Sequence, residues 1–133
     1  MSLTLYFAPG ACSFVPHSML ELSGVAFEPH SVKLHKNEQR SPEYLAINPR
    51  GQVPVLVDDG QGITQIVAIL LHLDAKLPEA GILPASGLAR TRALQTLVWM
   101  NNTVHPTFTH VFMPDKFTDD EAAKQAIRAH ATK

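Results

Sequence analysis

The feature that most constrains the fold is the order of a short strand, a Pro-Gly turn and a helix at the start of the chain. Leu3 to Phe7 (LTLYF) is rich in β-forming residues and stops at Pro9-Gly10. Ala11 to Gly24 carries apolar residues at helical spacing and ends on glycine, which predicts a helix with a C-terminal glycine stop. Pro16 fits only in the first turn of a helix, so we expect this helix to begin close to Cys12-Ser13.

The following segments predict more strands. Phe27 to Leu34 is expected to form a second strand, and a short helix is expected around Pro42 to Leu45. Two further strands, Pro54 to Val57 and Gly62 to Ile63, flank Asp58-Asp59-Gly60, a sequence typical of a hairpin turn.

A second helix is expected after the hairpin. Thr64 is a good N-cap, and the residues after it place apolar side chains at helical spacing as far as Leu77-Pro78. The order strand, helix, strand, irregular segment, hairpin, helix predicts a mixed four-stranded α/β unit of thioredoxin type.

The remaining residues predict a helical region. Pro78 to Ser86 (PEAGILPAS) has the composition of a linker, while Leu88 to Met113 and Asp119 to Thr132 look helical, with a break near Pro114. The fold class is therefore α/β, a thioredoxin-like N-terminal domain followed by a truncated all-helical C-terminal region. We expect the domains to span residues 1–79 and 80–133.

Composition excludes several classes of protein. The 133 residues are 45% hydrophobic with a formal net charge of -1, which is too apolar for a disordered chain. Balanced charge argues against a nucleic-acid partner. The longest apolar stretch, Ile63 to Leu73, is too short to span a membrane, and the first residues lack the features of a secretory signal. We therefore expect a cytoplasmic protein.

Cys12 is the most informative single position. As the only cysteine it allows no internal disulfide and no thiolate metal cluster, so no metal site is expected. It lies where a helix begins, and the N–H groups and positive dipole end there are expected to lower the pKa of the thiol. A lone cysteine is otherwise a small buried apolar residue, and its place at a strand-to-helix turn favours the functional thiol over that alternative. Val15 occupies the position of a CxxC partner, so Cys12 would act as a single thiol.

Two backbone features suggest a binding site. Val53-Pro54 is a candidate cis peptide at a strand entry, and such a bend would leave the backbone of Val53 free to pair with an extended peptide. The residues around Gln65 and Ile66 begin a helix, whose N–H groups can hold a carboxylate. A trans proline and a plain helix cap are the alternatives. A mildly basic stretch is either a solvated face or an attractor for a small anion: His30, Lys33, His35, Lys36 and Arg40.

The second region has one polar pair of interest. Leu94, Leu97 and Val98 form an apolar stripe that Asn101 and His105 continue. Polar residues on the extension of such a stripe often line a cleft, although a structural histidine is equally compatible with the pattern. Pro106 is expected to kink the helix here.

These residues in this order resemble the glutathione transferase family, most closely its bacterial beta class. The segments that carry the resemblance are APGACSFVPH (8–17), NPRGQVPVL (48–56), DDGQGITQIVAIL (58–70), WMNN (99–102) and HPTFTHVFMP (105–114). The resemblance implies a thioredoxin-like domain followed by a helical domain, a homodimer, glutathione as co-substrate, a small hydrophobic electrophile as second substrate and a role in detoxification.

The resemblance also implies roles for individual residues. Cys12 stands at the beta-class cysteine that contacts or bonds the glutathione sulfur. Val53 stands before the family's cis-proline, where the backbone pairs with the cysteinyl part of glutathione. His105 is implied to be a supporting donor in catalysis. The glutathione-binding positions implied are Cys12, Lys36, Gln52, Val53, Pro54, Gln65, Ile66 and Asn101.

Three departures from the family pattern bear on these roles. Gln65 replaces an acid that normally meets the γ-glutamyl ammonium, a loss of roughly 1–2 kcal/mol of binding. Ile66 replaces a residue that is often serine. The spacing from Trp99 to His105 is shorter than in the family by nearly one helical turn. The family's helical domain also continues beyond the length of this chain, so we expect uncovered apolar faces.

The first hypothesis is a glutathione transferase that conjugates glutathione to small electrophiles or carries out glutathione-dependent thiol–disulfide exchange through Cys12. A non-catalytic binding or interaction module of the same fold is the alternative. A thiol redox protein that uses no tripeptide is a third possibility, and it requires a low thiol pKa.

Overall fold

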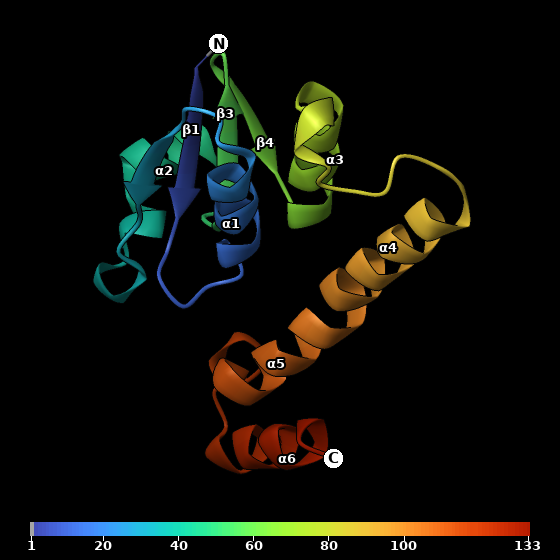
Figure 1. The fold of residues 1–133 in the computed structure, drawn as a ribbon. Coiled ribbons are helices and arrows are strands. Elements are labelled where there is room, and N and C mark those ends of the chain that lie inside the picture. Colours follow the sequence, from blue (N-terminus) through green and yellow to red (C-terminus); the bar gives the residue numbers. More distant parts are fainter. Residues whose placement is uncertain (1) are drawn as a thin grey trace. The chain divides into compact units, whose positions relative to one another are not determined.

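The structure is a computed structural model that describes residues 2–133. Its contacts divide the chain into two compact units, Met1–Ala85 and Ser86–Lys133. The first unit contains β1 (Leu3–Phe7), α1 (Phe14–Ser23), β2 (Glu28–Ser31), α2 (Pro42–Ile47), β3 (Val55–Asp58), β4 (Gln61–Thr64) and α3 (Ile66–Lys76) (Figure 1). The second contains α4 (Gly87–Trp99), α5 (His105–Phe112) and α6 (Glu121–Ala131).

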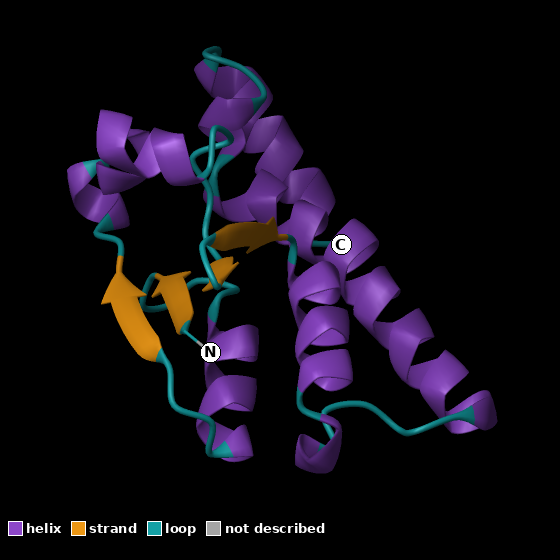
Figure 2. Ribbon diagram, turned by 90° about the horizontal axis from the view of Figure 1, so that it is seen from above, coloured by secondary structure: helices purple, strands orange, loops and turns teal. Residues whose placement is uncertain are grey.

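The four strands form one mixed sheet in the order β2-β1-β3-β4. β1 and β2 are parallel because α1 crosses between them, whereas β3 runs antiparallel to β1 and joins β4 through a hairpin. The helices of this unit lie on both sides of the sheet (Figure 2). This arrangement, followed by a helical region, confirms the predicted fold class.

Successive side chains of a strand point to opposite faces of the sheet, so the apolar core is divided between the two faces. Leu5 and Leu56 pack on one face with Leu20 of α1 and with Ile69 and Leu73 of α3. The opposite face is smaller and is covered by α2.

On that smaller face Val55 packs with Val32 and Tyr44, and Tyr6 contacts the edge of the Tyr44 ring at a centroid distance of 5.9 Å. The predicted short helix is thus confirmed, as Pro42–Ile47, with the Ser41 hydroxyl accepting the Tyr44 N–H as its cap.

The predicted second strand is too long. It was expected over Phe27 to Leu34, but β2 covers only Glu28–Ser31, because its pairing with β1 ends at the register Phe7 with Ser31. Leu34–Lys36 then turns as a 3-10 helix. All four residues of β2 are exposed, as befits an edge strand.

The predicted long helix from Leu88 to Met113 is interrupted. Met100–Val104 forms a π-helical turn between α4 and α5. Pro106 has no N–H to donate to the carbonyl of Asn102, so the hydrogen-bond register of the helix changes in the turn before it. The expected irregularity is therefore present, just ahead of the proline.

Within the second unit, α6 makes polar contacts with the 3-10 turn Pro114–Lys116, within itself and with α5. The Lys124 ammonium lies 2.6 Å from an Asp115 carboxylate oxygen and 2.7 Å from one of Glu121. Arg128 donates to the carbonyl of Val111 at 3.3 Å. Large apolar side chains remain exposed in both units, as expected: Phe14, Leu22, Leu88, Trp99, Phe108, Phe112 and Met113 are among them.

Candidate functional site

One end of the sheet gathers most of the sequence-predicted residues. The parallel strands β1 and β2 finish there, because Phe7 pairs with Ser31. β3 begins at the same end and β4 finishes there, because Val55 pairs with Tyr6 on one side and with Thr64 on the other. The seven predicted positions of the first unit lie directly beyond these strand ends: Cys12, Lys36, Gln52, Val53, Pro54, Gln65 and Ile66.

The turn that carries Cys12 is held by the residue after it. The Ser13 hydroxyl is fully buried and accepts the Ala8 N–H at 3.0 Å while donating to the Ala8 carbonyl at 3.1 Å. This closes the turn between β1 and α1 and fixes the backbone next to Cys12. The Cys12 thiol then lies 3.8 Å from the carbonyl oxygen of Val53 and donates to it.

The prediction of a lowered pKa for the Cys12 thiol is wrong. Burial raises the pKa of the thiol above its ordinary value, and this outweighs the lowering effect of the Cys12 and Ser13 backbone N–H groups. The sequence located the helix start correctly, but it does not report how much the turn buries the sulfur. The ligand-free thiol is therefore protonated at neutral pH.

The Val53-Pro54 peptide bond is cis, as the sequence predicted. The preceding carbonyl, that of Gln52, accepts two hydrogen bonds, from the Tyr44 hydroxyl at 2.7 Å and from Asn48 Nδ2 at 2.8 Å. The segment that leads into β3 is thus anchored from α2. Sequence reasoning had assigned no role to Tyr44 or Asn48, although the Asn-Pro turn and the short helix before it were signals.

The predicted N-cap of α3 is wrong by one residue. Thr64 is the last residue of β4, where it pairs with Val55, so the chain turns into the helix only after it. Gln65 takes the N-cap position with a φ of 73°, and its side chain makes no capping hydrogen bond. A non-glycine residue in the left-handed region is strained, and such residues concentrate at functional sites.

Lys36 ends the 3-10 helix Leu34–Lys36 and is exposed. In the basic stretch around it, Lys33 is already partly neutralised. Its ammonium lies 3.9 Å from a Glu38 carboxylate oxygen, and its backbone N–H donates to Glu38 at 2.7 Å. Lys36 therefore carries more of the free positive charge than Lys33 does.

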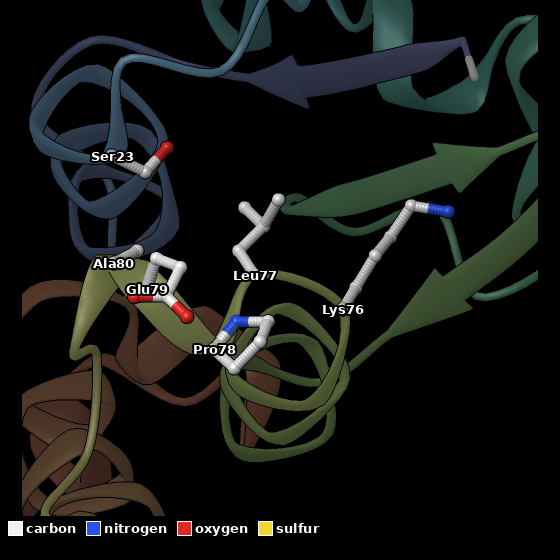
Figure 3. A pocket seen from close by; sticks show the side chains of 6 residues that line it. All are labelled: Ser23, Lys76, Leu77, Pro78, Glu79 and Ala80. Carbon is white, nitrogen blue, oxygen red and sulfur yellow. The ribbon is translucent and has the colours of Figure 1, made fainter.

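Two hollows lie in the first unit. The smaller, of about 290 Å³, is lined by Ser23 and by residues from Lys76 to Ala80, at the C-terminal ends of α1 and α3 (Figure 3). The predicted residues lie at the opposite ends of these helices, so this hollow is not the candidate site.

The larger hollow, of about 600 Å³, is mostly apolar and begins beside the Cys12 turn. Its walls come from the end of β1, the turn after it and the outer face of α1: Phe7, Ala8, Pro9, Gly10, Phe14, His17, Ser18, Glu21 and Leu22. It offers apolar surface beside the turn that carries Cys12.

Two of the predicted site residues, Asn101 and His105, lie in the second unit. Asn101 lies in the π-helical turn and donates to Asn102 at 3.0 Å, and His105 begins α5 with an exposed side chain. Close partners surround His110 of the same helix, whose Nδ1 lies 2.7 Å from the Pro106 carbonyl oxygen and whose ring stacks on Phe117 at a centroid distance of 4.2 Å.

The structure contains a buried charge cluster that the sequence analysis did not predict. Asp58, 8% exposed, receives His72 Nε2 at 2.7 Å and the Lys76 ammonium at 2.8 Å on the same oxygen. His72 and Lys76 are four residues apart, a spacing that places both side chains on one face of α3 and that is visible in the sequence. The cluster joins β3 to α3.

Two features are absent from the described residues, a cluster of metal-ligating side chains and a membrane-spanning helix. Residues 2–133 contain no group of three or more His, Cys, Asp or Glu side chains placed to hold a metal ion. No helix within these residues is long and apolar enough to cross a membrane.

Comparison with known proteins decides the family. The model of the glutathione S-transferase N-terminal domain matches residues 1–75, more than half of the chain. The chain belongs to the glutathione S-transferase family. Its relatives include glutathione S-transferase GstA of Escherichia coli O157:H7, which is 36% identical over 134 residues, covering 98% of this chain and 65% of the relative. Glutathione S-transferase GST-4.5 of Xanthomonas campestris is 37% identical, covering 96% and 61%.

Solved structures agree with this assignment. A glutathione transferase homologue from Sulfitobacter with bound glutathione matches with a TM-score of 0.91 and 29% identity, covering 98% of this chain and 63% of that one. A bacterial beta-class glutathione S-transferase from Sphingomonas chungbukensis matches with a TM-score of 0.79 and 32% identity, covering 97% and 64%. The chain thus spans a little under two thirds of the length of these family members.

Proposed function

We propose that the first unit of this chain binds glutathione, and that the protein is a glutathione transferase with a beta-class type of site. The observation that carries the proposal is the 3.8 Å contact between the Cys12 thiol and the Val53 carbonyl, at the sheet end where the family motifs meet. The glutathione bound in the Sulfitobacter structure supports the same assignment.

Each part of glutathione has a partner in this proposal. The Val53 backbone pairs with the cysteinyl residue as an added strand, and this brings the glutathione sulfur to Cys12. The N–H groups at the start of α3, from Ile66 onward, receive the γ-glutamyl carboxylate, helped by the helix dipole. Lys36 attracts the other carboxylate. Gln52, Pro54 and Gln65 complete the surroundings.

Conjugation is the first chemistry proposed. The glutathione thiol gives up its proton, its sulfur forms a bond to the electrophilic carbon, and the leaving group departs with the bonding electrons. The apolar hollow beside Phe7 and Phe14 offers a surface for a small hydrophobic electrophile. Asn101 and His105 are proposed to assist from the helical region, His105 as a hydrogen-bond donor.

Thiol–disulfide exchange is the second chemistry that the same site supports. Cys12 attacks one sulfur of oxidised glutathione, forms a mixed disulfide and releases one reduced glutathione. The raised pKa of Cys12 makes its thiolate scarce at neutral pH in the ligand-free protein. This same pKa argues against the third hypothesis, a redox protein that relies on an acidic thiol.

The remaining parts of the proposal follow the family. We propose a homodimer in the cytoplasm of a bacterium with a role in detoxification, no resident metal, and no nucleic-acid or membrane partner. The domain limits proposed from the sequence, residues 1–79 and 80–133, stay a prediction.

A non-catalytic binding module is the second candidate. Gln65 and Ile66 favour it, because neither offers the charge or the hydroxyl that the family pattern places there. Retention on immobilised glutathione alone fits both candidates, so the two must be separated by chemistry.

The experiment is an intact-mass measurement before and after incubation with oxidised glutathione near neutral pH. We expect a single glutathione adduct that Cys12→Ser abolishes, together with retention of the wild-type protein on immobilised glutathione. Retention without an adduct, and without conjugating activity toward a small electrophile, would support the binding module instead. If the protein is not retained on immobilised glutathione and also forms no adduct, the proposed function is overturned.

A further inference from the structure

Two side-chain hydrogen bonds hold the Gln52 carbonyl beside the candidate site. It accepts the Tyr44 hydroxyl at 2.7 Å and Asn48 Nδ2 at 2.8 Å, so both of its lone pairs are used. Both donors come from side chains that are almost fully buried, Tyr44 at 5% and Asn48 at 3% exposure. A peptide oxygen with two buried donors has little freedom to rotate.

This oxygen belongs to the same peptide plane as the Val53 N–H. The six atoms of a peptide unit are coplanar, and in a trans unit the C=O and N–H point in opposite directions. Holding the Gln52 carbonyl toward α2 therefore turns the Val53 N–H away from α2. The orientation of the Val53 N–H is therefore set through the Gln52 carbonyl.

The two donors are themselves fixed. The Tyr44 ring packs with Val32 and Val55 under the sheet, and its N–H is capped by the Ser41 hydroxyl at 3.2 Å. Asn48 uses its other amide atom, Oδ1, to accept the Arg50 N–H at 3.1 Å. Each donor is thus braced at a second point.

The Tyr44 hydroxyl keeps its proton under physiological conditions. Burial, with a smaller effect from the neighbouring Tyr6, raises the pKa of Tyr44 to about 12. The phenol therefore keeps its proton near neutral pH and remains a hydrogen-bond donor to the Gln52 carbonyl oxygen.

We propose that Tyr44 is a positioning residue for glutathione recognition, acting with Asn48 by fixing the Gln52–Val53 peptide plane so that Val53 presents its backbone to the tripeptide. This inference rests on the proposed function for the ligand, whereas the plane that it describes exists in the ligand-free chain. The Tyr44 hydroxyl donates to the Gln52 oxygen and acts on the ligand through it.

The structure supplies a matched control. Tyr6 belongs to the same aromatic cluster, with its ring centroid 5.9 Å from that of Tyr44. Tyr6→Phe deletes one hydroxyl from this cluster and leaves both donors to Gln52 in place. Tyr44→Phe deletes one hydroxyl of the same kind and removes one of the two donors.

Two readouts test the inference on the whole chain. The first is the carbonyl-carbon NMR shift of Gln52 without ligand, which responds to hydrogen bonds on that oxygen. The second is the dissociation constant for reduced glutathione. We expect Tyr44→Phe to move the Gln52 shift and to weaken binding by roughly three- to ten-fold, the effect of one hydrogen bond. Tyr6→Phe is expected to change neither.

The outcomes separate cleanly. Equal affinities in the two variants would overturn the inference, whether or not the Gln52 shift moves. A weaker affinity in Tyr44→Phe without a change in the Gln52 shift would overturn it too, because the effect would then come from general loosening. If the wild-type chain does not bind glutathione, the proposed function fails, and so does the assignment of Tyr44 to recognition. The Gln52 shift then still reports whether Tyr44 holds the peptide plane.

Discussion

The Cys12 thiol and the Val53 carbonyl oxygen, 41 positions apart in the chain, lie 3.8 Å from each other at one end of the sheet. The first ends the turn after β1, and the second precedes the proline that leads into β3. Their contact brings the thiol of the candidate site next to the backbone that is proposed to pair with the ligand. Partial burial of the thiol at this point opposes formation of a thiolate.

The alkylation of Cys12 is expected to be slow at neutral pH. Burial raises the pKa of its thiol, so the rate with iodoacetamide should rise with an inflection above the ordinary cysteine pKa of about 8.5. Mass spectrometry reads this directly because the chain has one cysteine. The same protein unfolded in denaturant is the control, and an inflection lower in the folded than in the unfolded protein would contradict the structure.

The same shift has a consequence for stability. A thiol whose pKa is raised by folding contributes stability fully below its unfolded pKa, and that contribution is lost as the pH rises through the folded value. The free energy of unfolding of the wild-type protein should therefore fall more steeply than that of Cys12→Ser at alkaline pH. Parallel curves for the two proteins would count against the raised pKa.

The substitution Gln65→Glu is expected to strengthen glutathione binding. A carboxylate at the start of α3 would supply the charge-assisted partner for the γ-glutamyl ammonium, worth roughly 1–2 kcal/mol or about ten-fold in affinity. Calorimetric titration measures it. Gln61→Glu adds the same charge on the exposed strand β4 and should leave the affinity unchanged. If both variants bind like the wild type, the missing acid does not limit recognition.

The substitution Asp58→Asn is expected to lower the free energy of unfolding by about 1–3 kcal/mol, because it weakens two charge-assisted hydrogen bonds at a buried position. Denaturant unfolding measures this. Asp59→Asn is the matched control, since Asp59 is exposed and accepts the Ser2 N–H at 2.8 Å through one oxygen, which the amide retains.

Acid should weaken this cluster in a defined direction. The hydrogen bond from Lys76 lowers the pKa of Asp58, and this exceeds the opposing effect of burial, with His72 lowering it further. The contribution of Asp58 is therefore complete above the ordinary aspartate pKa of about 4 and is lost as the pH falls through the lowered value. The stability gap between wild type and Asp58→Asn should narrow at low pH, and a gap that widens would contradict the cluster.

The substitution Gly51→Ala is expected to be more damaging than a similar change elsewhere. Gly51 has a φ of 60°, and an added Cβ would lie 2.7 Å from the Gln39 carbonyl oxygen. Gly24 has a φ of 69° with open space around it. Gly24→Ala should cost about 1 kcal/mol, and Gly51→Ala about 2–4 kcal/mol, in thermal or denaturant unfolding. Equal costs would mean that the backbone before Gln52 is loosely packed.

The sequence predicted the fold well where the signal was local. The β-forming residues of LTLYF, the Pro9-Gly10 stop and the glycine at the end of α1 are short-range features, and the structure keeps all three. Val53-Pro54 was predicted as a cis peptide from the turn before it. These features depend on backbone preferences of a few residues, which a sequence displays directly.

The sequence failed where tertiary contacts decide. The end of β2 depends on how far β1 extends beside it, and the position of Thr64 depends on its pairing with Val55. The pKa of Cys12 depends on how much the turn is buried. Tyr44 and Asp58 act on partners elsewhere in the chain, so neither residue stands out without the structure.

The central claim is that glutathione binds at the sheet end formed by Cys12, Val53 and the start of α3. The most direct measurement is a titration of the isotope-labelled chain with reduced glutathione, followed by backbone amide NMR. We expect saturable shifts concentrated at Cys12, Val53 and Ile66, with the amides of Lys76 and Leu77, at the other end of α3, unchanged. No saturable shift, or shifts gathered at the hollow near Lys76, would contradict it.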